Sequence, residues 1–152
     1  MNSWLVGLGW GVLGIVAGAC IGMQAPINGQ LGRLLGYPVA AAAVSFLAGG
    51  VVLWAITFIY ASRSGVSLGW GAVPVWMYVA GGLLGMVYVT SSVILTPLIG
   101  AAAVMALSVA GQMVAGILLD RIGFMGVAVR ELSLGRVAGA LLLVAGVVIR
   151  TT

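Results

Sequence analysis

Charged side chains are missing from very long stretches of this 152-residue chain. None occurs in residues 1–32, 34–62 or 64–119, and apolar residues make up 63% of the sequence. Uncharged apolar runs of about 18 residues or more are typical of membrane-spanning helices. Soluble domains carry charge on about a quarter of their residues, against 5% here. The sequence therefore predicts an all-α integral membrane protein.

Turn residues divide this apolar sequence into five spans. The stretch 74–119 would make roughly 69 Å of helix, about twice the hydrocarbon core of a bilayer, so it must fold back. Residues 96–100, which read TPLIG, are the expected turn. The last span is short, but Arg136 and Arg150 at its ends can extend to the headgroups. The predicted spans, which together form one transmembrane domain over residues 1–152, are about 4–31, 38–61, 74–95, 98–119 and 134–149.

The arginines bear on orientation rather than on a nucleic-acid partner. They lie at the ends of the predicted spans, where side chains of this type anchor at the headgroups, and they form no cluster that would bind nucleic acid. With five spans the termini lie on opposite sides of the membrane. The side of the N-terminus receives Arg63, Arg121, Arg130 and Arg136, and the other side receives Arg33 and Arg150. This bias is weak, so it permits insertion in both orientations.

The inventory of reactive side chains argues against an enzyme. The chain has no histidine and no lysine, one cysteine, Cys20, and only two acids, Asp120 and Glu131. That leaves few candidates for a catalytic base and neither a disulfide nor a metal site. We expect no catalytic residue, no metal and no cofactor.

Polar residues interrupt the first span near its end. Gln24 and Asn28 are four residues apart and share one helical stripe, with Pro26 between them. Proline removes one backbone hydrogen bond, so we expect a kink here. Carboxamides at membrane depth must meet protein groups or a wet cavity. They could simply join helices by hydrogen bonds, but the combination with a proline favours a cavity lining.

Other spans offer matching polar and aromatic groups. In the fourth span Ser108 and Gln112 share a stripe, and for Gln112 a bridging role and a binding role are equally compatible with the pattern. The residues predicted to bind a substrate are Gln24, Asn28, Gln112, Ser108, Tyr78, Tyr88 and Trp10.

Glycines at helical spacing predict close helix packing, because small residues let helix backbones approach in lipid. The first span carries Gly14, Gly18 and Gly22, the third carries Gly81 and Gly85, and the last carries Gly135, Gly139 and Gly146. We expect these positions to pack helices or to form a dimer contact.

Three blocks of the sequence resemble the YdcZ-type branch of the drug/metabolite transporter superfamily. They are AGACIGMQAPINGQLGRLLGYPVAAAAVSFLAGG, GQMVAGILLDRIGFMG and LSLGRVAGALLLVAGVVI. The resemblance implies a five-span half-transporter of the inner membrane. Such a protein would pair with a second copy, or with an oppositely oriented paralogue, as an antiparallel dimer. In the related small multidrug exporters a glycine heptad in the last helix mediates dimerisation, and Gly139 and Gly146 have that spacing. Those exporters carry a glutamate in the first helix, where this chain has Gln24 and Asn28.

These observations predict a carrier or facilitator of a small organic solute, such as an organic cation or a metabolite. Its binding site would lie near the midplane at the interface of an antiparallel homodimer, in contact with the lipid bilayer and with no nucleic-acid partner. A passive channel and a non-transporting accessory subunit are the alternatives.

Overall fold

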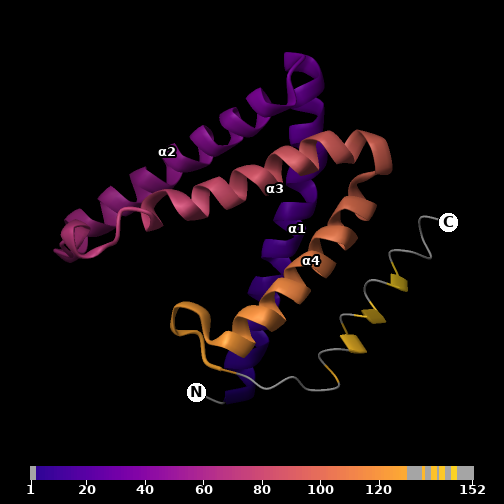
Figure 1. Ribbon diagram of the computed structural model, residues 1–152. Helices are drawn as coiled ribbons and strands as arrows, with labels where there is room; N and C mark the ends of the chain where they lie inside the picture. Colours follow the sequence, from indigo (N-terminus) through magenta and orange to yellow (C-terminus); the bar gives the residue numbers. More distant parts are fainter. Residues whose placement is uncertain (1–2, 130–134, 136–137, 140, 143–144, 147–152) are drawn as a thin grey trace. The chain divides into compact units, whose positions relative to one another are not determined.

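The computed structural model describes residues 3–129, 135, 138–139, 141–142 and 145–146. The chain divides into two compact units, Met1–Pro97 and Leu98–Thr152, and each is treated by itself. Within the described residues all regular structure is helical (Figure 1). The elements are α1 (Ser3–Leu35), α2 (Pro38–Ser64), the short 3-10 helix η1 (Trp70–Ala72), α3 (Met77–Ile99), α4 (Ala101–Ile122) and the 3-10 helix η2 (Phe124–Gly126).

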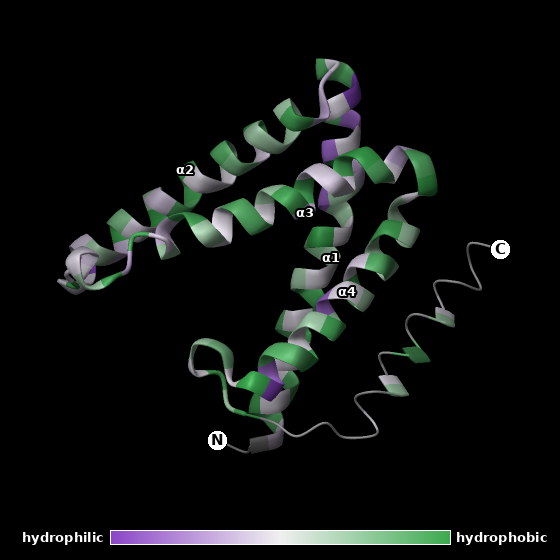
Figure 2. Cartoon of the chain, in the orientation of Figure 1, coloured by the Kyte–Doolittle hydropathy of each residue, from purple (hydrophilic) through white to green (hydrophobic). Residues whose placement is uncertain are grey.

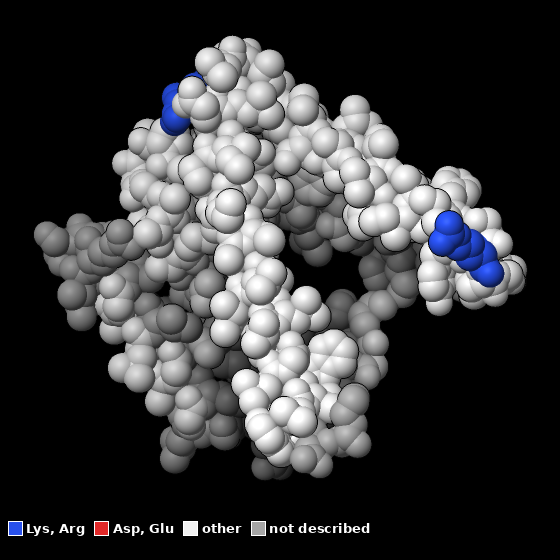
Figure 3. All heavy atoms as spheres, turned by 180° about the vertical axis from the view of Figure 1, so that it is seen from behind, with Lys and Arg blue, Asp and Glu red and all other residues white. Residues whose placement is uncertain are grey.

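In the part of the chain that the structure describes, four helices are long and apolar enough to cross a membrane: Trp4–Leu35, Pro38–Ser64, Met77–Ile99 and Ala101–Ile122. Figure 2 shows apolar colouring along most of their length, with hydrophilic residues of α1 gathered toward its C-terminal end. On the face of the molecule that Figure 3 shows, arginine atoms appear at two separate places, and the described atoms between them are uncharged. The all-helical membrane class is confirmed with four spans. The fifth predicted span, 134–149, lies largely outside the described residues.

The first two helices run further than the sequence predicts, because each continues to a glycine that can end it. α1 reaches Leu35 and is followed by Gly36 at φ 71°, and α2 reaches Ser64 and is followed by Gly65 at φ 65°. These backbone conformations are left-handed, which favours glycine just after a helix. The polar last turns stay helical because Arg33 and Arg63 are favourable near a helix C-terminus and can extend out of the hydrocarbon.

The reversal after α3 also comes later than predicted. α3 passes through Pro97 to Ile99, and the chain turns at Gly100, whose φ is 82°. Pro97 cannot donate a hydrogen bond to the carbonyl of Val93, but it lies in the last turn, so only one helical bond is lost. At the other end α3 begins at Met77, after a turn in which the Met77 N–H donates to the carbonyl of Pro74.

The core of the first unit lies where α1 and α2 meet near their connecting turn. Ala41 and Ala42 of α2 are 0% and 2% exposed and form a cluster with Val89 and Val93 of α3. Small side chains permit this close approach. A Cβ atom at Gly32 of α1 would lie only 2.9 Å from Cγ1 of Val93. Near this turn, α1, α2 and α3 therefore pack together over a short stretch of each helix.

Away from this turn, α2 and α3 run as a hairpin that diverges from α1 (Figure 1). Phe46 of α2 contacts α3, since a Cβ atom at Gly85 would lie 3.0 Å from Cζ of its ring. Gly29 of α1 packs on α3 near the turn, 3.8 Å from Thr96 by the same measure. The divergence leaves an opening between α1 and α2, and this opening positions the candidate site.

Candidate functional site

Gln24 lies in the C-terminal half of the membrane span Trp4–Leu35 that α1 forms. It precedes the last residue of α1, Leu35, by about eleven residues, which is roughly 16 Å of helix. A hydrocarbon core is about 30 Å thick, so Gln24 lies about half of that thickness from the C-terminal end of α1. Pro26 lies two residues later, and the helical assignment of α1 is continuous through it. The carbonyl of Gly22 has no proline N–H to bond, and the kink expected at Pro26 stays a prediction.

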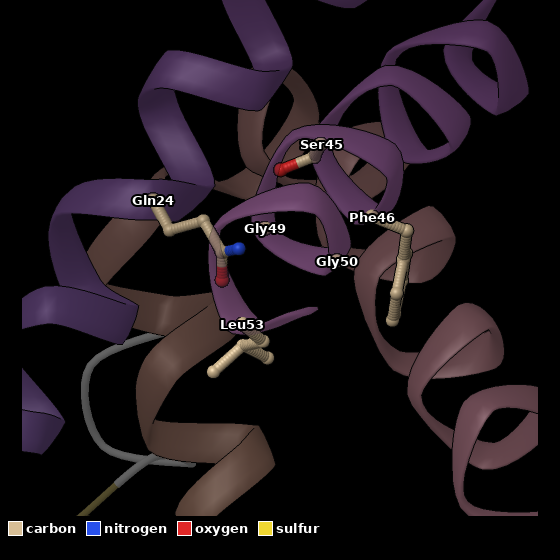
Figure 4. A pocket seen from close by; sticks show the side chains of 6 residues that line it. All are labelled: Gln24, Ser45, Phe46, Gly49, Gly50 and Leu53. Carbon is tan, nitrogen blue, oxygen red and sulfur yellow. The ribbon is translucent and has the colours of Figure 1, made fainter. Parts of the chain in front are cut away.

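A cavity of about 250 Å³ opens beside Gln24, between α1 and α2. Figure 4 shows the Gln24 side chain extending from α1 toward the part of α2 that carries Gly49, Gly50 and Leu53. Ser45 and Phe46 complete the lining. Among the described residues none forms a hydrogen bond with the Gln24 carboxamide. The site thus presents one free amide, one hydroxyl and an aromatic ring, without a charged group.

Asn28, one turn further along α1, has a different environment. It is only 4% exposed, and its Nδ2 donates a hydrogen bond to Oγ of Ser45 at 3.2 Å. This contact joins α1 to α2, which is the bridging role that buried amides commonly have in membranes. Ser45 also lines the cavity. Asn28 therefore lies behind the wall of the cavity, and its hydrogen bond to Ser45 holds that wall in place.

Tyr88 of α3 packs against the core cluster of the first unit. Its hydroxyl is buried and has no hydrogen-bond partner in the part of the chain that the structure describes, and the same holds for Oγ1 of Thr90 and Thr96. The neighbouring Ser92 donates to the carbonyl of Val89 at 2.8 Å. Tyr88 is not part of the lining of the Gln24 cavity.

Two aromatic candidates lie far from Gln24 along their helices. Tyr78 is ten residues from Tyr88, or about 15 Å of helix, and its hydroxyl donates to the carbonyl of Trp70 in the loop before α3. Trp10 is 68% exposed, and about 21 Å of helix separates it from Gln24. The structure therefore does not bring Tyr78 or Trp10 to this cavity.

The candidates on α4 belong to the second unit. Ser108 donates to the carbonyl of Val104 at 2.7 Å, one turn earlier in the same helix. Gln112 is exposed. That these residues lie close to Gln24 stays a prediction.

The glycines predicted to pack helices differ in their surroundings. Cβ atoms at Gly14, Gly18, Gly135 and Gly146 would meet nothing within 4 Å, whereas one at Gly139 would lie 3.6 Å from Cε of Met113. Among the predicted glycines Gly85 also makes a contact, and the described contacts further use Gly29 and Gly32, which were not predicted. The GQLG pattern around Gly29 and Gly32, directly after Asn28, is the sequence signal that points to this contact.

The lining of the Gln24 cavity contains no His, Cys, Asp or Glu side chain. Within the residues that the structure describes, no group of three or more His, Cys, Asp or Glu side chains comes together. The site offers hydrogen bonds and an aromatic surface, which suit recognition of a small molecule rather than covalent chemistry.

Comparison with the curated proteins found no match, and comparison with the solved structures found none either. Residues 9–149 match the protein-family model described as "Putative inner membrane exporter, YdcZ". The match covers nearly the whole chain and agrees with the apolar helices, so the protein is a multi-pass protein of the inner membrane. The chain belongs to the YdcZ family of the drug/metabolite transporters.

Proposed function

We propose that this protein carries a small organic solute across the inner membrane, and that the Gln24 cavity is half of its binding site. One observation supports this more than any other. About half a hydrocarbon-core thickness from the end of α1, a carboxamide without a protein partner among the described residues borders an open cavity of about 250 Å³. An unsatisfied polar group costs several kcal/mol in hydrocarbon. The cavity therefore needs a hydrogen-bonding occupant, either water or a solute.

The other half of the site comes from a second subunit of opposite orientation. The cavity lies on one side of the hairpin made by α1 and α2, and nothing in the first unit closes its mouth. Two inverted copies related by an axis in the membrane plane meet at the midplane. Because Gln24 lies about half a core thickness from the end of α1, the two amides would be at the same level. Exposed Gln112 on α4 is available as a further hydrogen-bonding group.

The test separates Gln24 from a matched glutamine on the same helix. Purified protein is screened by thermal shift against neutral, cationic and anionic organic compounds, and each stabilising compound is then tested for counterflow in proteoliposomes. Gln24→Ala should weaken binding about tenfold or more, a loss of one or two hydrogen bonds in a desolvated site. Gln30→Ala is the control, because Gln30 is exposed near the end of α1 and bonds to Arg33.

Equal counterflow by wild type and Gln24→Ala would overturn the site assignment. Saturable flux with counter-exchange supports a carrier, whereas unitary currents across a planar bilayer would identify a channel. Elution of both variants at the wild-type position in gel filtration ensures that a lost activity does not reflect unfolding.

A further inference from the structure

The Gln24 cavity is the inner end of a longer series of cavities along α2. We propose that these cavities form a route from the loop at residues 65–76 to Gln24, and that the route admits neutral, partly apolar solutes. This proposal rests on the proposed function and adds to it a path and a class of substrate.

Neighbouring cavities share lining residues. Gly50 and Leu53 line the Gln24 cavity and also a second cavity of about 350 Å³, here called the outer cavity. The outer cavity in turn shares Leu68 and Trp70 with a third one of about 200 Å³, the loop cavity. The remaining walls are Trp54 and Thr57 for the outer cavity, and Gly69, Val73 and Tyr78 for the loop cavity.

The series is long enough to connect the middle of the membrane with its surface. Along α2 it extends from Ser45 to Thr57, which is about 18 Å of helix and more than half of a 30 Å hydrocarbon core. It ends at the loop between α2 and α3, where tryptophan and tyrosine are typical of the membrane–water interface. The route thus runs from the interface to the midplane on one side of a protomer.

Aromatic stacking holds the outer end in a fixed shape. The ring centroids of Trp54 and Trp70 lie 5.7 Å apart at 22°, and those of Trp70 and Tyr78 lie 6.0 Å apart at 24°. The Tyr78 hydroxyl donates to the Trp70 carbonyl and fixes the loop to the start of α3. These contacts connect the loop with both helices of the hairpin, so the aromatic wall is part of the fold.

The chemistry of the lining selects the solute. The walls offer indole and phenol rings, then aliphatic groups, and finally the hydroxyl of Ser45 and the amide of Gln24. They contain no acid, arginine or lysine. A charged solute would lose its hydration without meeting an opposite charge, and contact with aromatic faces restores only part of that loss. A neutral molecule with a ring or alkyl body and one hydrogen-bonding group fits both the aromatic outer end and the polar inner end of the route.

Gly50 is the place at which this route can be blocked. It lines both the Gln24 cavity and the outer cavity, and a Cβ atom there would meet nothing within 4 Å. The Cβ atom of a leucine at this position would therefore fit, and the rest of its side chain would narrow the passage. Ala48 is exposed, lies about 200° around α2 from Gly50, and lines none of the three cavities. Ala48→Leu is therefore the matched control.

The experiment uses two single thiols, one at each end of the route. In the full chain carrying Cys20→Ser, Ser45→Cys marks the inner end and Thr57→Cys marks the outer cavity. The probes are methyl methanethiosulfonate, which is neutral, and its trimethylammonium-ethyl and sulfonatoethyl analogues. Each probe transfers its alkylthio group to a thiolate and releases methanesulfinate. Rates in proteoliposomes are expressed relative to an exposed loop thiol made by Ser67→Cys.

We expect the neutral probe to modify the inner thiol about tenfold or more faster than either charged probe. Adding Gly50→Leu should slow that reaction about tenfold while leaving the outer thiol unchanged, because the block lies between them. Ala48→Leu should change neither rate. If Gly50→Leu leaves the inner rate unchanged, the probe arrives from the lipid and the route is wrong. Equal rates for charged and neutral probes would overturn the substrate class.

These outcomes are separable from those of the proposed function. Gln24→Ala is tested by the equilibrium affinity for a solute, whereas Gly50→Leu is tested by the rate at which the probes reach the inner thiol. Loss of binding in Gln24→Ala, together with an unaffected inner thiol in Gly50→Leu, would leave the site in place and remove the route.

Discussion

The side-chain amide of Asn28 donates a hydrogen bond to Ser45 Oγ at 3.2 Å, one helical turn beyond the free amide of Gln24. Two carboxamides on a single stripe of α1 therefore have different roles. One holds α1 and α2 together, and the other faces the cavity between them. This difference leads to the first prediction.

Asn28→Ala should reduce stability, and its effect should be coupled to that of Ser45→Ala. Removing one partner leaves the other buried without a hydrogen bond. A double-mutant cycle on detergent unfolding should give a coupling of about 0.5–1.5 kcal/mol. A coupling near zero would show that the contact does not contribute to the fold.

Gly32→Ala should destabilise the first unit. The added Cβ would lie 2.9 Å from Cγ1 of Val93 and 3.4 Å from Cα of Pro38, and Val93 is buried and stiff. Overpacking of this kind costs about 1–3 kcal/mol. Gly9→Ala is the matched control, since its Cβ would meet nothing within 4 Å. Thermal unfolding of both variants checks the prediction, and equal midpoints would refute it.

Tyr78→Phe should loosen the loop at residues 65–76. The variant keeps the stack on Trp70 but loses the hydroxyl that donates to the Trp70 carbonyl. We expect a red shift of tryptophan emission and faster cleavage of the loop by protease. Tyr60→Phe changes an exposed tyrosine and should have neither effect. Identical spectra and cleavage rates in the two variants would argue against an anchoring role for the hydroxyl.

The protein should insert in both orientations, because its arginines favour one side only weakly. Ser67→Cys in the Cys20→Ser chain should be labelled by an impermeant maleimide from either side of the membrane. Adding Val66→Arg increases the bias and should shift labelling to one side. Labelling from a single side in the parent chain would mean a fixed topology, and an antiparallel homodimer would then be impossible.

Much of the fold could be predicted from the sequence because the hydrocarbon core of a membrane restricts the backbone structures that can cross it. Uncharged runs longer than the hydrocarbon core must be helices, and they must reverse where proline and glycine gather. The residues at which the helices end were harder to predict. α3 continues through Pro97 because a proline in the last turn removes a single bond, and the actual reversal requires the positive φ of Gly100.

The site was predicted in part, since helical periodicity places Gln24 and Asn28 on one face but does not say what lies opposite. The hydroxyl that binds Asn28 comes from Ser45, seventeen residues away on another helix. Nothing in the pattern of a single helix identifies that partner. The GQLG pattern likewise marks Gly29 and Gly32 as small residues, but it does not identify their neighbours on α2 and α3.

The position of Gln24 at the proposed interface of two inverted copies has a consequence for how such a protein can evolve. In a symmetric pair, any substitution near the midplane appears twice in the same binding site. A substitution that improves one half of the site therefore changes the other half in the same way. Gene duplication would remove this constraint. Once two copies are encoded separately, one amide can be kept while the other becomes a charged or apolar group, and the passage can acquire a direction.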